Sequence, residues 1–236
     1  MRKEQFGELS ARVTGGPDGR GGGDGPVVVL LHGFGAPGDD LVDLATFLRV
    51  PAEVRFVFPE APLLLDGGPG RAWWMLDMAL FERRMRGEQI DRSDDQPPAL
   101  PALREQLSSA LTAIEERLGV GRERLVLGGF SQGSMLACDV TLHAEHKPAA
   151  LILLSSTLIA RSSWSARVAS CKGLPVLQTH GLRDPILPYA DAEKLRDLLL
   201  AAGADLTFVP FPGGHELPPI TLAAVSKLIV DTTGRS

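Results

Sequence analysis

The stretch GGFSQGSM, from Gly128 to Met135, holds a serine whose neighbours could make it a nucleophile. Ser131 lies between Gly129 and Gly133 in the pattern G-x-S-x-G, which is typical of a sharp turn that presents a reactive hydroxyl. The chain has 26 glycines, so the same pattern could be a glycine-rich turn with an ordinary serine. A serine hydroxyl needs a histidine to accept its proton and a carboxylate to orient that histidine. The sequence around the motif must therefore decide whether Ser131 is a nucleophile or an ordinary serine in a glycine-rich turn.

A carboxylate and a histidine follow Ser131 in the chain order serine, acid, histidine that α/β enzymes with this turn use. Asp184 comes after the apolar run PVLQTHG, and His215 comes after the run DLTFVPFPG. Both should lie at the carboxyl ends of strands, which is the sheet edge where Ser131 is expected. We therefore predict Ser131 as the nucleophile, His215 as the general base and Asp184 as the acid that orients the imidazole.

The other histidines fit this chemistry less well. His143 and His146 fall within a predicted helix and should be surface residues. His32 and His180 lie at strand ends, where structural hydrogen bonding is the expected role. For His215 itself, the alternative is a loop histidine that caps the last helix.

Other carboxylates are weaker candidates for the acid. Asp139 lies inside the helix that follows the serine, and Asp191 is expected to cap a helix start. Glu216 is too close to His215 in sequence to orient its ring easily.

Acyl transfer also requires donors for the oxyanion, usually the backbone N–H after the nucleophile and one from a loop after an earlier strand. Gln132 supplies the first of these N–H groups. Phe34 stands between two glycines in LLHGFGAPGDD, directly after the first strong strand, and its N–H is the candidate for the second. The alternative is that HGFG is only a tight turn.

The elements around these residues alternate between strands and helices. Apolar runs rich in β-branched residues predict strands covered on both faces: PVVVLLHGF, VRFVFPEA, RLVLGGF, ALILLSST, PVLQTHG and DLTFVPFPG. Helical patterns lie between them at 39–49, 101–119, 134–146, 190–203 and 221–234. This alternation predicts an α/β fold with a mostly parallel central sheet and helices on both faces. Ser131 then falls at a strand-to-helix turn, as the motif requires.

The chain of 236 residues is expected to form a single domain over 1–236. The glycine-rich run at 14–26 should be a loop or hairpin that joins an early strand to the core. Residues 66–101 match neither the helix nor the strand period, which indicates a surface loop or a cover over the active site, and 82–100 could move as a lid.

The aromatic and methionine cluster in this segment has two interpretations. Trp73, Trp74 and Met75, together with Leu76 and Met78, could line an acyl pocket beside the nucleophile. Such a cluster could equally be ordinary hydrophobic core.

The composition of the chain limits the kinds of partner that it is expected to bind. The net charge of −5 and 22% charged residues provide no basic excess for nucleic acid or an anionic membrane. The N-terminus has no apolar run of a signal peptide or membrane span, so we expect a cytoplasmic protein. The two cysteines lack metal-ligand spacing, and no metal, phosphate-loop or dinucleotide motif is present, so a kinase, a metalloenzyme and a redox enzyme have no support in the sequence. Exposed apolar residues could pair two chains in a homodimer, but the sequence does not locate such a surface.

Taken together, LHGFGAPGDD, RAWW, GGFSQGSM, HGLRDPILP and GGHELPP resemble the phospholipase/carboxylesterase family of α/β-hydrolases, whose relatives include acyl-protein thioesterases and lysophospholipases. The resemblance extends from about Val27 to Pro219. It implies the α/β-hydrolase fold, the catalytic and oxyanion residues predicted above, and hydrolysis of small-molecule or lipid esters without a metal or organic cofactor. We expect a serine carboxylesterase that acts through an acyl-enzyme. The alternatives are a lysophospholipase or acyl-protein thioesterase for long acyl chains, and a non-catalytic hydrolase-like binding protein.

Overall fold

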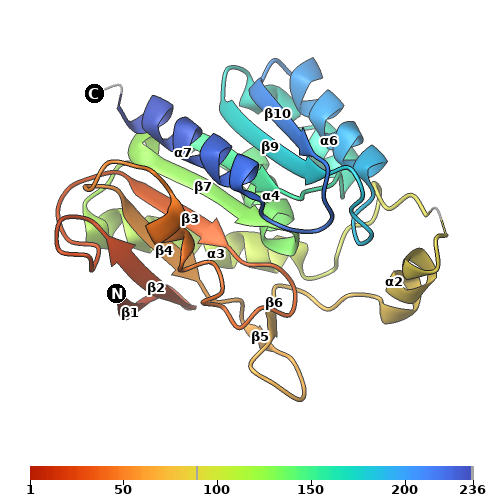
Figure 1. Cartoon of the computed structure of the whole chain (residues 1–236), viewed down its shortest axis with the longest axis horizontal. Coiled ribbons are helices and arrows are strands. Elements are labelled where there is room, and N and C mark those ends of the chain that lie inside the picture. The colour runs from red at the N-terminus through yellow and green to blue at the C-terminus, as the bar shows by residue number, and fades with distance from the viewer. Residues whose placement is uncertain (89, 235–236) are drawn as a thin grey trace.

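A mostly parallel sheet forms the centre of the computed structural model, which describes residues 1–88 and 90–234. Among these residues, eight strands lie in the order β1-β2-β4-β3-β7-β8-β9-β10 (Figure 1). β1 and β2 pair antiparallel, β2 joins β4 antiparallel, and all later pairs are parallel. The strands are β1 (Arg2–Phe6), β2 (Leu9–Gly15), β3 (Val27–Leu31), β4 (Arg55–Pro59), β7 (Leu125–Phe130), β8 (Ala150–Leu154), β9 (Pro175–Gly181) and β10 (Asp205–Phe211). The predicted α/β class and mostly parallel sheet are confirmed.

Helices cover both faces of this sheet, as the apolar strands predict. In β3, the side chains of Val27, Val29 and Leu31 pack on one face of the sheet. Those of Val28 and Leu30 pack on the other face. The first face carries α3 (Leu100–Leu118), α4 (Gln132–His143), α5 (Arg161–Ser165) and α6 (Tyr189–Ala201), and the second carries α1 (Leu44–Phe47) and α7 (Pro219–Thr233). Because successive side chains point to opposite faces, a strand between two helical layers is apolar at every position.

The predicted helix at 39–49 is wrong over most of its length. Only α1, a single turn at Leu44–Phe47, is helical, and Leu48 is already extended with ψ of 131°. Turns precede α1, and Leu41, Leu44 and Leu48 are nevertheless buried. The three leucines are thus buried without a continuous helix. A single hydrogen-bonded turn gains little from the cooperativity that stabilises longer helices.

The glycine-rich run is an ordered loop between β2 and β3, as expected. The Asp18 carboxylate accepts hydrogen bonds from the N–H groups of Arg20 and Gly22. The buried Arg55 side chain donates to the carbonyls of Gly23 and Gly25. These contacts hold the loop against the edge of the sheet opposite to the predicted site.

Residues 66–101 contain more regular structure than their composition predicts. A short hairpin pairs β5 (Leu63–Leu64) with β6 (Arg71–Ala72), and α2 (Met78–Met85) follows. Asp77 caps α2 by accepting a hydrogen bond from Leu80 N at 3.0 Å, and this N-cap is the sequence signal that could have located the helix. The segment lies at the end of the molecule toward which the parallel strands point (Figure 1).

A buried ion pair attaches α2 to the body of the protein. Arg84 Nη2 lies 2.6 Å from Asp191 Oδ2 in the first turn of α6, and both side chains are buried. The following stretch is held by backbone hydrogen bonds, from Ala160 N to Asp95 O and from Arg161 N to Ser93 O. The described part of 66–101 is therefore fastened at several points around the carboxyl ends of the strands.

Candidate active site

Ser131 occupies the junction between β7 and α4 in a conformation that non-glycine residues rarely adopt. Its φ is 53° and its ψ is −120°. The Ser131 N–H donates to Leu154 O in the neighbouring strand β8 at 2.8 Å, and Ser131 O accepts from Ser134 N at the start of α4. Such backbone conformations cost about 1–3 kcal/mol and persist where the surrounding structure imposes them. The strained strand-to-helix turn predicted from the motif is confirmed.

The glycines on either side of Ser131 are sterically required. A Cβ on Gly129 would lie 2.6 Å from Gly133 C and 2.7 Å from Leu31 O. A Cβ on Gly133 would lie 2.5 Å from His32 O. Real Cβ atoms essentially never approach backbone atoms this closely, so larger residues would push β3 and β7 apart.

Replacing Ser131 with glycine should stabilise the fold, because glycine adopts a positive φ without a Cβ penalty. Ser131→Ala is the matched control, since it also removes the hydroxyl but retains the Cβ. We expect the free energy of unfolding of Ser131→Gly to exceed that of Ser131→Ala by about 1 kcal/mol, the strain relieved less the conformational entropy of glycine. Urea unfolding of the two variants measures this difference, and equal stabilities would contradict strain in the turn.

The predicted acid and base meet across two loops at the sheet edge. Asp184 lies three residues after β9 and His215 four residues after β10, and these strands are parallel neighbours. Nδ1 of His215 lies 2.6 Å from Oδ2 of Asp184. Oδ1 of the same carboxylate accepts hydrogen bonds from the N–H groups of Ile186 and Leu187, each at 2.9 Å. The carboxylate is thus held on one side by its own loop and faces the imidazole with the other.

Opposing effects determine the charge of Asp184. Burial by itself would raise the pKa of this carboxyl, but the hydrogen bond and positive charge of His215 and the N–H groups of Leu187 and Ile186 lower it below its ordinary value. Asp184 is therefore ionised at neutral pH and can only accept a hydrogen bond. Nδ1 of His215 must then carry a proton, which leaves Nε2 as the nitrogen that can take one from a nucleophile.

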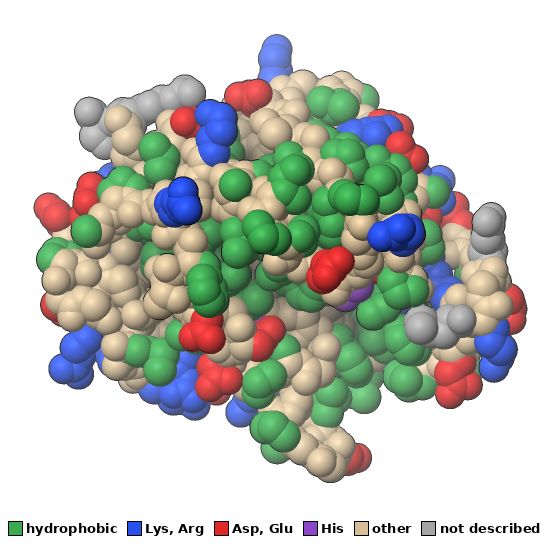
Figure 2. Space-filling view, in the orientation of Figure 1, with side chains coloured by type: hydrophobic (Ala, Val, Ile, Leu, Met, Phe, Trp, Pro, Cys, Tyr) green, Lys and Arg blue, Asp and Glu red, His purple; other side chains and the backbone are tan. Residues whose placement is uncertain are grey.

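Ser131 and His215 line one cavity of about 310 Å³. The His215 ring packs against the Phe130 ring with centroids 4.7 Å apart. The remaining walls are mainly apolar and include Trp74, Leu76, Met78, Phe81, Met135, Ile159 and Leu187. In Figure 2, a small area of histidine surface (purple) lies between an acidic side chain (red) and hydrophobic side chains (green). The arrangement suits a small apolar group beside a reactive polar centre.

Both candidate oxyanion donors border the same cavity. Phe34 and Gln132 line it, and among the described residues no acceptor bonds the backbone N–H of either one. The loop that carries Phe34 is held to β6, because Gly35 N donates to Arg71 O and Arg71 N donates to Ala36 O, each at 2.8 Å. Gln132 is the first residue of α4, where the helix dipole favours negative charge.

The side chain of Gln132 has a second role that sequence reasoning missed. Its Oε1 accepts from Trp73 N at 2.9 Å, and its Nε2 donates to Trp74 O at 2.8 Å. These two bonds fasten the start of the 73–78 stretch against the elbow. The partners are more than 50 residues apart in the chain, so no local pattern could have indicated the contact.

Of the three residues predicted to bind substrate, the structure places only Trp74 on the wall of this cavity. Trp74 lines the cavity, whereas Trp73 does not: it is 1% exposed, belongs to the core, and donates from Nε1 to His32 O at 2.9 Å. Met75 is 61% exposed and lines a neighbouring hollow of about 500 Å³. Gln132 bonds Trp73 N and Trp74 O and so fixes the backbone of these two residues. Their successive side chains then face different environments.

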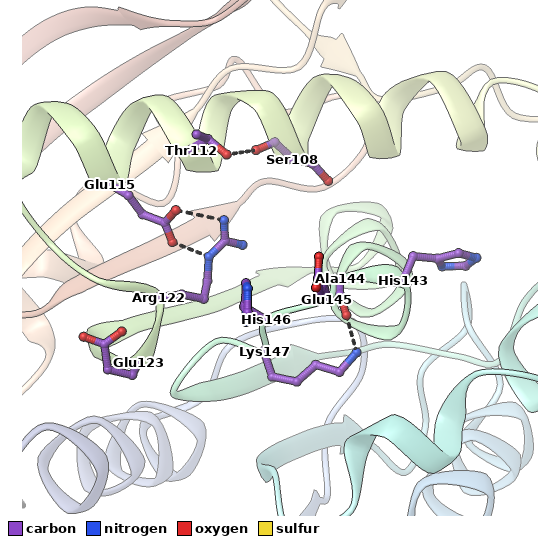
Figure 3. A pocket seen from close by; sticks show the side chains of 10 residues that line it. All are labelled: Ser108, Thr112, Glu115, Arg122, Glu123, His143, Ala144, Glu145, His146 and Lys147. Atoms are coloured by element: carbon purple, nitrogen blue, oxygen red, sulfur yellow. Dashed lines mark hydrogen bonds and ion pairs between the residues drawn. The ribbon is translucent and has the colours of Figure 1, made fainter.

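The remaining histidines lie outside the reactive centre. His32 and His180 make structural hydrogen bonds, as predicted: His32 Nε2 accepts from Ala61 N at 3.0 Å, and His180 Nε2 lies 2.8 Å from Leu187 O. His146 is exposed, but His143 is partly buried, with Nδ1 2.8 Å from Asp139 O. Figure 3 shows His143 and His146 beside a hollow of about 770 Å³ at the carboxyl end of α4 and next to α3, which neither Ser131 nor His215 lines.

The rejected acids have structural partners. Asp139 is fully buried and accepts from Arg104 Nε at 2.7 Å and from Trp164 Nε1 at 2.8 Å. Asp191 does not cap α6 as expected, but lies in its first turn and pairs with Arg84 and Lys194. Pro188 occupies the N-cap position, which has no side-chain hydrogen bond.

Two kinds of feature are absent from residues 1–88 and 90–234. No group of three or more His, Cys, Asp or Glu side chains could hold a metal ion. None of the helices described is sufficiently long and apolar to cross a bilayer.

Comparison with known protein families relates the sequence to hydrolases. Residues 22–232 match the family model described as phospholipase/carboxylesterase. Acyl-protein thioesterase 1 of Neurospora crassa is 28% identical over 215 residues, which cover 86% of this chain and 85% of that protein. Acyl-protein thioesterase 1 of Kluyveromyces lactis is 32% identical over 183 residues, covering 71% and 75% of the two chains.

Solved structures show the same architecture. The crystal structure of esterase PE8 superposes with a TM-score of 0.81 and 27% identity, covering 95% of this chain and 99% of that one. The Bacillus cereus carboxylesterase superposes with a TM-score of 0.70 and 20% identity over 95% of each chain, a likeness of fold alone. Both neighbours are esterases, and the fold is that of the α/β-hydrolases.

Proposed function

Because the chain belongs to the phospholipase/carboxylesterase family and is a hydrolase of the esterase and thioesterase type, we propose that it cleaves carboxylic esters through an acyl-enzyme on Ser131. One observation carries the proposal: the His215–Asp184 hydrogen bond of 2.6 Å beside an apolar cavity that Ser131 also lines. A nucleophile, a base and an orienting acid are the minimum set for this chemistry. The fold alone would not distinguish an enzyme from a binding protein, but this set of side chains favours the enzyme.

The proposed reaction has two halves. Ser131 Oγ attacks the ester carbonyl while His215 Nε2 takes its proton, and the N–H groups of Phe34 and Gln132 bind the resulting oxyanion. His215 then returns the proton to the leaving alcohol as the carbon–oxygen bond breaks, which leaves the acyl group on Ser131. A water molecule, deprotonated by His215, attacks this acyl-enzyme and releases the carboxylic acid. Asp184 keeps the imidazole in the required tautomer and stabilises its positive charge.

The size of the cavity favours esters with short or medium acyl chains. Its volume of about 310 Å³ is at the lower end of the range for small-molecule pockets. With p-nitrophenyl esters from acetate to laurate, we expect kcat/KM to rise by up to about fourfold for each methylene that is buried, at about 0.8 kcal/mol each. The rise should stop at a medium chain length, once the cavity is filled. Absence of hydrolysis by the folded wild type on any ester would contradict the proposal and favour a binding protein.

A second candidate is hydrolysis of long acyl chains from lysophospholipids or protein thioesters, and the relatives named acyl-protein thioesterase 1 favour the thioesters. The adjoining hollow of about 500 Å³ favours it, because Trp74, Arg92, Asp95 and Pro97 line both spaces. The ion pair from Arg92 Nε to Asp95 Oδ2, at 2.6 Å, belongs to this shared wall. A kcat/KM that still rises at laurate, together with cleavage of a palmitoyl thioester, would select this candidate.

A further inference from the structure

The His32 ring makes two hydrogen bonds that together determine its tautomer. Nε2 faces the N–H of Ala61 at 3.0 Å, so this nitrogen must be the acceptor. The proton of the neutral ring is therefore on Nδ1, which donates to Gly33 O at 2.8 Å. The ring is 1% exposed, and burial lowers the pKa of His32 although the hydrogen bond to Gly33 opposes this effect. His32 is accordingly neutral at neutral pH, with both nitrogens committed to backbone groups.

The bond to Gly33 O also sets the direction of another group, the N–H of Phe34. A peptide unit is planar and trans, so its C=O and N–H point in opposite directions. When His32 holds the Gly33 carbonyl toward the buried ring, the Phe34 N–H must point away from that ring. Phe34 lines the cavity, and within the described chain its N–H has no acceptor.

The same peptide lies directly against the elbow. A Cβ on Gly33 would be 3.4 Å from Ser131 Cβ and 3.3 Å from the Phe130 ring. Glycines flank Phe34 on both sides, and Gly35 has a φ of 83°, so the chain by itself would allow other orientations of this peptide. Within the loop, Ala36 N donates to Gly33 O at 3.5 Å, whereas His32 Nδ1 lies 2.8 Å from the same oxygen, so the His32 ring provides the closer restraint on this peptide.

We propose that His32 is a positioning residue, which aims the Phe34 N–H at the oxyanion by holding the Gly33 carbonyl. This role rests on the proposed function, since it requires an oxyanion formed by attack of Ser131. The backbone of His32 is restrained as well, because its carbonyl accepts from Trp73 Nε1 at 2.9 Å. His32 acts on the reaction only through the Gly33–Phe34 peptide and does not line the cavity.

Two substitutions of His32 distinguish the effects of its two hydrogen bonds, one to Gly33 O and one from Ala61 N. In His32→Asn, the amide nitrogen is as many bonds from Cα as Nδ1 and can donate to Gly33 O. In His32→Gln, the amide oxygen is as many bonds from Cα as Nε2 and can accept from Ala61 N, but Gly33 O loses the side-chain donor at Nδ1 and keeps only the longer bond of 3.5 Å from Ala36 N. If His32 were only a packing residue, the two variants would lose activity alike.

The test compares kcat, KM and inhibition by a trifluoromethyl ketone, which forms a tetrahedral oxyanion adduct with serine hydrolases. His32→Gln is expected to lower kcat by about 10²- to 10³-fold, as for loss of one oxyanion donor, with KM nearly unchanged and the inhibition constant raised by a similar factor. His32→Asn should lose no more than about tenfold. His146→Gln, at an exposed position, is the control and should match the wild type. Equal kcat in the Asn and Gln variants, or losses confined to KM, would overturn the proposal.

A measurement on the wild type is independent of whether these variants fold. Nitrogen NMR of enzyme with ¹⁵N-labelled histidines should show His32 with a protonated Nδ1 and a bare Nε2. The opposite tautomer would overturn the proposal, because Nδ1 could then not donate to Gly33 O. Absence of Ser131-dependent ester hydrolysis would refute the proposed function together with this role. Hydrolysis that depends on Ser131 but is equal in the Asn and Gln variants would refute the role of His32 alone.

Discussion

Ser131→Ala is expected to lower kcat by about 10⁴-fold or more on any ester that the wild type hydrolyses. Without the hydroxyl, no acyl-enzyme can form, and only the binding cavity and the oxyanion donors remain to assist attack by water. The β-carbon is retained, so the strained turn at φ of 53° and the fold should be preserved. Release of p-nitrophenol by equal amounts of folded wild type and variant measures the effect.

Ser163→Ala provides a matched control for that experiment. Ser163 Oγ lies 3.3 Å from His143 Nε2, so a serine outside the cavity also contacts a histidine. It does not line the cavity with Ser131, and its removal should leave kcat unchanged. If Ser131→Ala retained wild-type activity, the G-x-S-x-G stretch would be an ordinary glycine-rich turn.

Asp184→Asn should lower kcat by about 10³- to 10⁴-fold, the second largest loss. The neutral amide cannot stabilise the positive imidazolium of His215. Its NH₂ group can also donate to Nδ1, which would place the ring proton on Nε2 and prevent that nitrogen from accepting the proton of Ser131. The pKa of Asp184 lies below its ordinary value of 3.8, so the wild-type carboxylate should remain ionised throughout an assay at pH 5–9.

Asp191→Asn tests the competing assignment of the acid. Asp191 is also buried, but it pairs with Arg84 and Lys194 and thereby attaches α2 to α6. Loss of one partner from a buried pair should reduce the free energy of unfolding by about 3 kcal/mol or more, with a much smaller effect on kcat than Asp184→Asn. Urea unfolding and ester hydrolysis of both variants separate the two effects. A silent Asp184→Asn beside an inactive Asp191→Asn would reverse the assignment.

Several parts of the molecule could be predicted because they depend on local sequence and the rules of parallel sheets. The apolar runs ending at Phe130, Gly181 and Phe211 are strands, and the parallel arrangement brings their carboxyl ends to one edge. The first two are mostly buried, but β10 was wrongly predicted to be covered on both faces, because it is the last strand of the sheet and only Phe211 in it is buried. Asp184 and His215 follow two of these ends, so their proximity follows from strand direction alone. The positive φ of Ser131 and the crowding at Gly133 likewise follow from the turn itself.

Other features depend on contacts between segments that are distant in the chain. Trp73 and Trp74 are the same residue type and both are buried, yet only Trp74 lines the cavity, and the Gln132 side chain fixes this backbone by bonding Trp73 N and Trp74 O. The helical spacing at 39–49 predicts the burial of Leu41, Leu44 and Leu48 but not the turns that achieve it. Burial of an apolar side chain is non-directional, so several backbone conformations satisfy one pattern.

The sequence by itself therefore determined the fold class, the strained elbow and the strand ends that carry the predicted nucleophile, acid and base, because residue spacing and backbone geometry specify them. Only the tertiary structure decided how the loops between those strands meet. The hydrogen bond from Ala61 N to His32, the two hydrogen bonds of Gln132 to Trp73 and Trp74, and the attachment of α2 through Arg84 all link separate segments. Directional hydrogen bonds form only when both partners are in place, and that placement results from the packing of the whole chain.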